Sequence, residues 1–297
     1  MFNKFVPRLA LIVTTVIWGL TFVFIKEALV EVPPSTFLLY RFGLASFGSI
    51  IIFNRRIRKP TRSLAIKGIS AGTVLFLGYW FQTWGLKFTT ATKSGFITGM
   101  FVVFVPVLSF LFLRKKVGLL KWISVLLALT GLGLMIVVAG GGMSGVNFGD
   151  VLTIFCAVLY AIHIILVGKF SKPDDYITFF VTQILTVTVF SGINSLALGN
   201  LTLPRALPSW TAIGFTGLLA TAFAYWAQNR YQPMISDTGA GIIYSAEPFF
   251  AALFGYLIAG EQLTGWQMAG GGLILLAILL SQIPPTELLS RVAPEER

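Results

Sequence analysis

Charged and chemically reactive side chains are scarce in this sequence. Only 11% of its 297 residues are charged and 56% are hydrophobic, whereas about a quarter of the residues in a soluble domain are charged. A chain of this composition lacks the polar surface that a water-soluble globule of its size requires. It has a single cysteine, Cys156, which excludes an internal disulfide and any metal site built from several cysteines.

Recognisable catalytic patterns are scarce as well. His163 is the only histidine, which excludes the zinc-protease pattern of two histidines on one helix. No two carboxylates lie close together within an apolar run, so the sequence offers no obvious acid–base pair inside a membrane. We therefore expect no enzymatic activity, no cofactor and no metal site.

The apolar residues occur in long uncharged runs, such as 122–139 and 265–283. About 20 residues of helix, at 1.5 Å per residue, cross a hydrocarbon core that is about 30 Å thick. The runs are continuous rather than alternating, which favours helices over the strands of a membrane barrel. We predict an all-α integral membrane protein with ten transmembrane helices, at residues 8–27, 36–54, 65–86, 93–113, 119–139, 149–168, 176–197, 209–230, 239–259 and 265–283.

The lysines and arginines predict an orientation. If the N-terminus is cytoplasmic, most of the 22 Lys and Arg residues lie on cytoplasmic segments. Cytoplasmic loops carry an excess of these residues, so both termini are predicted to be cytoplasmic. The net charge of +11 then faces an anionic lipid leaflet, and the lipid bilayer rather than a nucleic acid is the expected partner.

Two stretches, 79–95 and 225–241, share residues at positions that are 146 apart. Earlier in each half the offset between matching positions is 142. We predict two copies of a five-helix unit, residues 1–140 and 141–297, and the second copy is inverted in the membrane because five is odd. The matching pairs include Tyr79 and Tyr225, Trp80 and Trp226, Gln82 and Gln228, Trp18 and Tyr160, and Arg41 and Gln183.

Inverted repeats of this kind are typical of secondary transporters. A state that is open to one side then has a near-equivalent state open to the other side, as alternating access requires. A duplication that only builds a stable bundle, or a channel, is the alternative. The two Tyr-Trp-x-Gln stretches are expected at opposite mouths of one cavity, either as gates that close alternately or as aromatic anchors at the membrane interface.

The last third of the chain contains Glu247-Pro248 and Gly260-Glu261 within long apolar runs. With these motifs the chain resembles EamA-type members of the drug/metabolite transporter superfamily, and the resemblance covers nearly the whole sequence. It implies ten helices in a bacterial or archaeal cytoplasmic (inner) membrane. It also implies a central cavity and the movement of small metabolites, often outward.

Three ionisable residues inside predicted helices are candidate functional groups, because ionisable side chains are costly in a membrane. Glu247 lies near mid-membrane beside Pro248 and could bind a cation, a proton or a substrate amine, or hold the bundle together as a neutral group. His163 could couple transport to protons, or be a buried neutral imidazole. Arg41 could face the cavity and attract an anion, or extend to the outer surface.

Further candidates are aromatic, polar or small residues on the same predicted helices. The candidates for substrate binding or gating are Trp18, Tyr40, Arg41, Tyr79, Trp80, Gln82, Tyr160, His163, Gln183, Tyr225, Trp226, Gln228, Tyr244 and Glu247. The candidates for helix breaks and close helix packing are Gly95, Gly99, Pro106, Gly241, Ser245 and Pro248; small residues four apart allow helices to approach closely.

These observations predict a secondary active transporter that exports small organic metabolites, such as amino acids, by alternating access. The expected partners are a small-molecule substrate and a proton as coupling ion, and the expected state is a monomer or a weak dimer. A multidrug or cationic-compound exporter is the first alternative and a channel the second.

Overall fold

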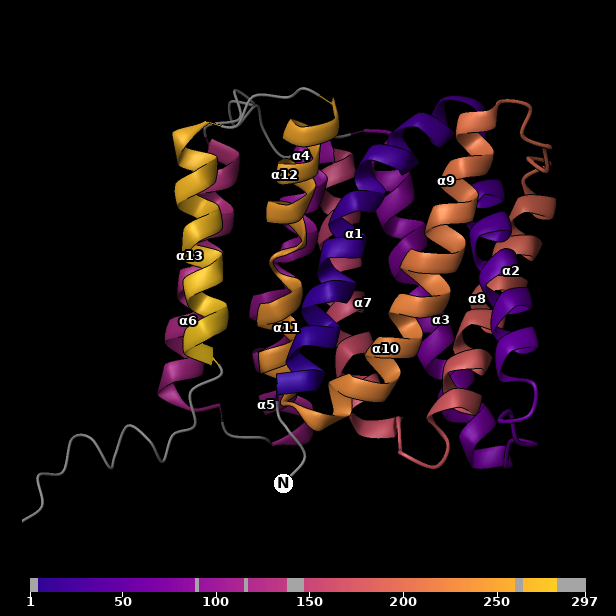
Figure 1. The fold of residues 1–297 in the computed structure, drawn as a ribbon, viewed down its shortest axis with the longest axis horizontal. Coiled ribbons are helices and arrows are strands. Elements are labelled where there is room, and N and C mark those ends of the chain that lie inside the picture. Colours follow the sequence, from indigo (N-terminus) through magenta and orange to yellow (C-terminus); the bar gives the residue numbers. More distant parts are fainter. Residues whose placement is uncertain (1–4, 89–90, 115–116, 138–146, 260–263, 282–297) are drawn as a thin grey trace, which may run out of the picture.

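The structure is a computed structural model that describes residues 5–88, 91–114, 117–137, 147–259 and 264–281. All the regular secondary structure in these residues is helical (Figure 1). The elements in chain order are α1 (Phe5–Glu31), α2 (Pro34–Phe53), α3 (Arg62–Gly85), α4 (Ala91–Gly99), α5 (Phe101–Leu113), α6 (Leu119–Val137), α7 (Phe148–Phe170), α8 (Tyr176–Ala197), α9 (Leu207–Gly217), the π-helix η1 (Leu218–Phe223), α10 (Ala224–Tyr231), the 3₁₀-helix η2 (Gln232–Met234), α11 (Asp237–Tyr244), α12 (Glu247–Ala259) and α13 (Gly265–Ser281).

The predicted all-α membrane fold is confirmed. Six helical segments of the described residues are long and apolar enough to cross a membrane, and four shorter helical stretches are also apolar. Three predicted helices are subdivided: 93–113 becomes α4 and α5, 209–230 becomes α9, η1 and α10, and 239–259 becomes α11 and α12. The number of ten crossings remains a prediction.

Local side-chain chemistry explains several helix ends. The Thr61 hydroxyl caps α3 by accepting a hydrogen bond from the Leu64 N–H (3.2 Å). Asn147 and Asp150 form a capping box at the start of α7. At the end of α1, the Glu31 carboxylate accepts hydrogen bonds from the N–H of Arg205 (2.5 Å) and the Ser209 hydroxyl (2.6 Å). This contact fastens the end of α1 to the start of α9.

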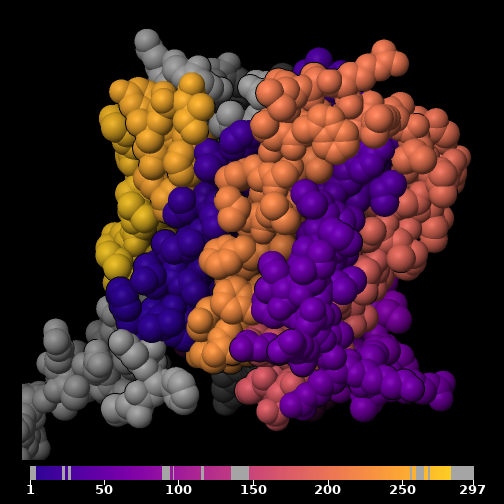
Figure 2. Space-filling view, turned by 45° about the vertical axis from the view of Figure 1, so that its right-hand side comes forward, coloured from indigo at the N-terminus to yellow at the C-terminus, as the bar shows by residue number. Residues whose placement is uncertain are grey.

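The helices form one elongated bundle in which α6 and α13 pack against each other at its edge (Figure 1). The first residues of α1 and the last residues of α13 lie at the same end (Figure 1). Figure 2 shows α1 in indigo beside α9 and α10 in orange, with α2 in purple on their far side. Further inside the bundle, α7 packs against α3, α4 and α5, and α2 packs against α8.

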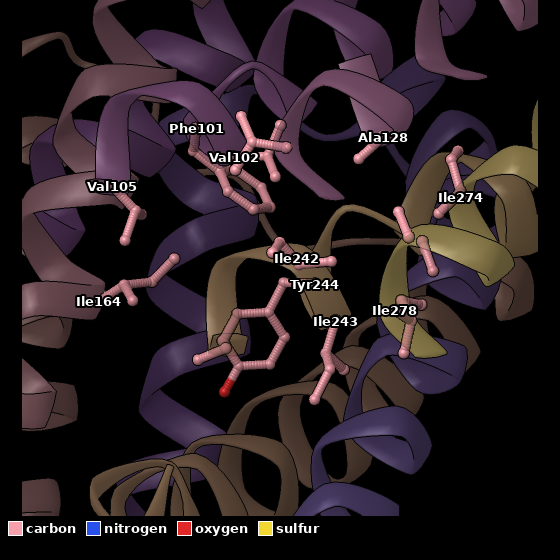
Figure 3. Packing of buried hydrophobic residues seen from close by; sticks show 14 of the residues in the cluster. Phe101, Val102, Val105, Ala128, Ile164, Ile242, Ile243, Tyr244, Ile274 and Ile278 are labelled. Atoms are coloured by element: carbon pink, nitrogen blue, oxygen red, sulfur yellow. The ribbon is translucent and has the colours of Figure 1, made fainter. Parts of the chain in front are cut away.

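The largest apolar cluster joins α5, α6, α7, α11 and α13. In Figure 3, Ile274 and Ile278 of α13 lie on one side of this cluster and Ile164 of α7 lies on the other. Tyr244 of α11 lies between them and is almost fully buried. The cluster therefore connects the α6–α13 pair to the helices that surround the centre of the bundle.

Candidate functional site

A cavity of about 440 Å³ lies between the helices of both halves of the chain. Its volume is within the range of small-molecule sites, about 300–1,000 Å³. It extends from the centre of the bundle toward the end where α1 and α3 terminate, as the lining residues Leu29 and Leu86 indicate. Ten of the residues predicted to bind substrate or to gate it line this cavity: Trp18, Arg41, Tyr79, Gln82, Tyr160, His163, Tyr225, Gln228, Tyr244 and Glu247.

The other four predicted residues lie outside the cavity lining. The Tyr40 hydroxyl donates to the Thr202 carbonyl oxygen (3.2 Å). The Trp80 ring lies 5.8 Å from that of Trp84, between ring centroids. Trp226 stacks on Phe53 with centroids 6.3 Å apart. The fourth, Gln183, belongs to a hydrogen-bonded group beneath the cavity.

Tyr79 and Tyr225, the matching residues of the two halves, contact each other. Their hydroxyl oxygens are 2.9 Å apart, and both rings are buried. The expectation that the two Tyr-Trp-x-Gln stretches lie at opposite mouths of the cavity is therefore wrong for the tyrosines. Gln82 and Gln228 follow them by one turn on α3 and α10, which pass each other in opposite directions (Figure 1).

Arg41 is a buried cation at the centre of the cavity, with 2% of its surface exposed. Its Nε donates to the Thr221 hydroxyl (2.8 Å) and an η nitrogen donates to the Tyr79 hydroxyl (3.1 Å). The guanidinium carbon lies 4.8 Å from the centre of the Tyr79 ring, a cation–π distance. Among the described residues no carboxylate forms an ion pair with Arg41.

Glu247 lines the same cavity and is the first residue of α12. Its carboxylate has neither a hydrogen bond nor an ion pair with any of the described residues. A buried charge is normally paired or hydrogen-bonded, since desolvation is costly. The site therefore presents a cation and an acidic group to one cavity without joining them to each other.

Two helices near the cavity are interrupted at matching positions. The α-helical hydrogen bonding is interrupted at Met100, between α4 and α5, and at Ser245 and Ala246, between α11 and α12. Met100 and Ala246 are 146 residues apart, the offset of the repeat. Pro248 lies in the first turn of α12, where a missing N–H leaves no helical hydrogen bond unmade.

The small residues and prolines singled out from the sequence differ in their surroundings. A Cβ atom at Gly99 would lie 3.7 Å from Pro248 Cγ, and one at Gly241 would lie 3.4 Å from a methyl group of Val105. At Gly95 it would meet no atom within 4 Å. Pro106 lies inside α5, six residues beyond the break at Met100, and Ser245 donates its hydroxyl to the Ile242 carbonyl (2.7 Å).

Buried polar side chains close the bundle beneath the cavity, on the side of the termini. His163 Nε2 lies 2.8 Å from Gln183 Oε1, and Gln183 Nε2 donates to Asn229 Oδ1 (2.9 Å). Gln232 donates to the Ile164 carbonyl (2.6 Å) and accepts from Gln228 (2.8 Å). The side chains that form these bonds are polar and at most 2% exposed: His163, Gln183, Gln228, Asn229 and Gln232. His163 is thus a hydrogen-bonded member of this closed end.

Several residues of the site were missed from the sequence. Thr221, Asn229 and Gln232 make the hydrogen bonds just described, and Thr21 and Thr83 line the cavity. The repeat could have identified the two threonines, since Thr21 matches His163 at the offset of 142 and Thr83 matches Asn229 at 146. Serine and threonine are common in membrane helices, so residue type alone did not mark them.

One stretch, Gly68–Gly72, fits the Gly-x-Ser-x-Gly pattern of hydrolase nucleophiles. That chemistry requires a sharp strand-to-helix turn that exposes the serine to substrate. Here the stretch lies within the continuous helix α3, and Ser70 is exposed on the outside of the bundle. We assign it no catalytic role.

Comparison with known proteins decides what kind of protein this is. The model of the EamA-like transporter family matches residues 7–137 and again residues 147–282. The chain belongs to the EamA-like transporter family. This EamA chain is 32% identical over 282 residues to an "Uncharacterized transporter" of Archaeoglobus fulgidus, covering 92% of this chain and 84% of the relative. The family and its relatives indicate a membrane transporter.

Two further relatives of this EamA chain are bacterial. The "Uncharacterized transporter YoaV" of Bacillus subtilis is 25% identical, covering 92% of this chain and 95% of the relative. The "Uncharacterized inner membrane transporter YedA" of Escherichia coli is 22% identical, covering 94% and 92%. A solved structure described as "Crystal structure of protein" superposes with a TM-score of 0.81 at 16% identity, covering 97% and 99%, which supports the fold alone.

Proposed function

We propose that this EamA transporter is a secondary carrier that exports small zwitterionic metabolites, with amino acids bearing apolar side chains as the leading class. The observation that carries the proposal is the pair Arg41 and Glu247, which face one cavity without an ion pair between them. A zwitterion supplies a partner for each: its carboxylate binds the guanidinium in a charge-assisted contact, and its ammonium group binds the glutamate.

The rest of the cavity favours an amphipathic substrate. Trp18, Tyr160, Tyr225 and Tyr244 contribute aromatic surface around the two ionisable groups. Such a lining, largely apolar with a few well-placed polar groups, is typical of sites for small organic molecules. A volume of about 440 Å³ accommodates an amino acid the size of leucine or phenylalanine.

The proposed mechanism is alternating access between two inverted repeats, residues 1–140 and 141–297. The helix contacts support it, because they are exchanged between the proposed halves: α1 packs on α9 and α12, as α7 packs on their counterparts α3 and α5. The matching helix breaks at Met100 and Ala246 also support it, since paired discontinuous helices are typical of the binding sites of such carriers.

Two of three matching pairs of buried residues differ in whether they line the cavity, as alternating access predicts. Thr21, Arg41 and Thr83 line the cavity. Of their counterparts, His163 also lines it, whereas Gln183 and Asn229 do not, and all three are joined by hydrogen bonds in the closed end. In the opposite state we expect Gln183 and Asn229 to line a cavity and Thr83 to be enclosed, while Arg41 remains at the central substrate site. With both termini in the cytoplasm, the present cavity faces outward.

Glu247 is the proposed proton-coupling site. A carboxyl group that binds the substrate ammonium while ionised can take up a proton after the substrate has left. The returning carrier would then carry no net negative charge at this position through the membrane, where an unpaired charge is costly. Proton uptake by the empty carrier is the corresponding expectation.

Transport by purified protein in proteoliposomes tests this function. We expect saturable uptake of labelled L-phenylalanine and L-leucine that is stimulated by the same amino acid inside the vesicles. Phenethylamine, which lacks the carboxylate, and 3-phenylpropanoate, which lacks the amine, should be poor substrates. Arg41→Gln and Glu247→Gln should abolish preference for the amino acid, while the lipid-facing control Thr130→Val retains it.

Other outcomes identify the alternatives. Phenethylamine uptake equal to that of phenylalanine, abolished by Glu247→Gln alone, would identify an exporter of cationic compounds. Flux that does not saturate and is not stimulated by internal substrate would identify a channel. Failure of every tested amino acid to bind or move would refute the zwitterion proposal.

A further inference from the structure

The helical segment α9–η1–α10 changes from α-helical to π-helical hydrogen bonding near the cavity. After α9, residues Leu218–Phe223 form the π-helix η1, and α10 begins at Ala224. The Ala224 N–H bonds to the carbonyl of Leu219, five residues back, and also to that of Thr221, rather than to that of Ala220. Single π-helical turns are rare and occur frequently at functional sites. In the first half, α3 is continuous α-helix.

The π-turn contains one residue that α3 lacks. Gly217 lies just before the turn, and a Cβ atom on it would stand 3.0 Å from the carbonyl oxygen of Arg41. In the first half, a Cβ atom on Gly72 would stand 2.7 Å from the carbonyl oxygen of Gln183, the counterpart of Arg41. Gly72 and Gly217 are therefore structural equivalents, separated by 217 − 72 = 145 positions. After the turn, Tyr79 and Tyr225 are equivalents separated by 146. The register between the halves thus shifts by one residue within the π-turn.

The inserted residue changes what the helix presents to the cavity. The Ala220 carbonyl, which Ala224 does not reach, accepts a hydrogen bond from Trp18 Nε1 (2.9 Å). The hydroxyl of the next residue, Thr221, accepts the hydrogen bond from Arg41 Nε (2.8 Å) and is fully buried. Two adjacent residues of one turn therefore hold the cation and the indole that line the site.

We propose that the π-turn Leu218–Phe223 is a positioning element for recognition of the substrate carboxylate. Thr221 fixes the Arg41 guanidinium at Nε while Tyr79 binds one η nitrogen, which leaves the other η nitrogen for a ligand. Ala220 fixes the Trp18 ring beside it. The inference rests on the proposed role of Arg41 as the carboxylate-binding group. It adds a residue, Thr221, that touches no substrate and acts through Arg41.

Transport kinetics test the proposal with substitutions that change one group at a time. Thr221→Val removes the hydroxyl while keeping the shape, and we expect the KM for L-phenylalanine to rise about tenfold with a smaller change in kcat, because a hydrogen bond to a charged group is lost. Thr221→Ser should restore most of the affinity. Thr216→Val, which removes a buried hydroxyl bonded to the Ala212 carbonyl of the same helix, is the matched control.

A second measurement does not depend on the substrate. In protein labelled with ¹⁵N-arginine, a buried and hydrogen-bonded Arg41 Nε–H should give a slowly exchanging NMR signal, assigned by its loss in Arg41→Lys. We expect the signal to be lost in Thr221→Val and retained in Thr221→Ser and Thr216→Val. Deletion of Leu219, which is 46% exposed, should convert the π-turn to α-helix and remove the same signal.

The outcomes separate this inference from the proposed function. An unchanged Arg41 signal and unchanged KM in Thr221→Val would overturn the positioning role, even if the deletion variant does not fold. If Arg41→Gln leaves transport of L-phenylalanine unchanged, the proposed function fails, and the NMR result alone then decides whether the π-turn positions Arg41.

Discussion

Gln232 is the residue whose replacement should most directly change the balance between the two proposed states. It is fully buried in the closed end, where it donates to the Ile164 carbonyl and accepts from Gln228. Its counterpart in the first half, 146 positions earlier, is Leu86, which lines the cavity. Gln232→Leu therefore gives the closed end the side chain that the other half has at its open end.

The expected magnitude follows from the two hydrogen bonds. Each contributes about 1 kcal/mol net, so their loss weakens the closed end by about 2 kcal/mol. Because 1.4 kcal/mol is a factor of ten, the ratio of states shifts about 30-fold toward opening on the side of the termini. The new leucine offsets part of this by apolar packing, so the figure is an upper value.

Site-directed labelling measures the shift. Val167 is fully buried and is the counterpart of the cavity-lining Ile25. In a Cys156→Ala background, adding Gln232→Leu should make Val167→Cys react faster with a membrane-impermeant maleimide from the side of the termini, by at most about 30-fold. Ile25→Cys, labelled from the opposite side, should react more slowly. Unchanged labelling of both positions, or faster labelling of both, would refute the argument, because the second result indicates general loosening.

Three further predictions concern transport and stability. Glu247→Gln should reduce amino-acid flux in proteoliposomes far more than His163→Ala at equal protein content, and near-wild-type flux in the glutamine variant would contradict the site. Hydrogen bonds from Ser209 and the backbone lower the pKa of Glu31 below 4.5. A carboxyl group whose pKa is lowered by folding stabilises the folded state above its unfolded pKa, and this stabilisation is lost as the pH falls through its folded pKa. Glu31→Gln should therefore lower the Tm at pH 7, with the difference from wild type vanishing in acid. Leu132→Ala, in the core, should destabilise the protein by about 2 kcal/mol, whereas Leu126→Ala, on the exposed face of the same helix, leaves the Tm nearly unchanged.

The helices were predictable because apolar length alone determines what can cross a bilayer. The interruptions of the helices were not predictable in this way. The break between α4 and α5 falls at Met100, whereas Pro106 lies inside the uninterrupted helix α5. A proline marks a missing N–H, but it does not determine where the α-helical hydrogen bonding is interrupted. The π-turn could not be predicted from composition, because one added residue leaves the apolar pattern of the helix unchanged. It appears only as a change from 145 to 146 in the offset between matching residues of the two halves.

The repeat predicted which residues correspond but not where they meet. Tyr79 and Tyr225 were assigned to separate mouths from the directions of their helices. Yet the proposed inverted repeat has a pseudo-two-fold axis, and equivalent residues that lie beside such an axis meet, as the hydroxyl contact of 2.9 Å between these tyrosines illustrates. A sequence offset of 146 pairs two residues but does not say how far each of them lies from the axis.

The charged residues at the site do not follow the repeat, which fits the proposed zwitterionic substrate. Arg41 comes from the first half and its counterpart is the neutral Gln183; Glu247 comes from the second half and its counterpart, at the offset of 146, is Phe101. A perfectly symmetric site would present two like charges, which repel each other and fit no single amino acid. In the proposed mechanism the two halves exchange conformations because their sequences correspond, while one orientation of the zwitterion is selected because their charged residues do not.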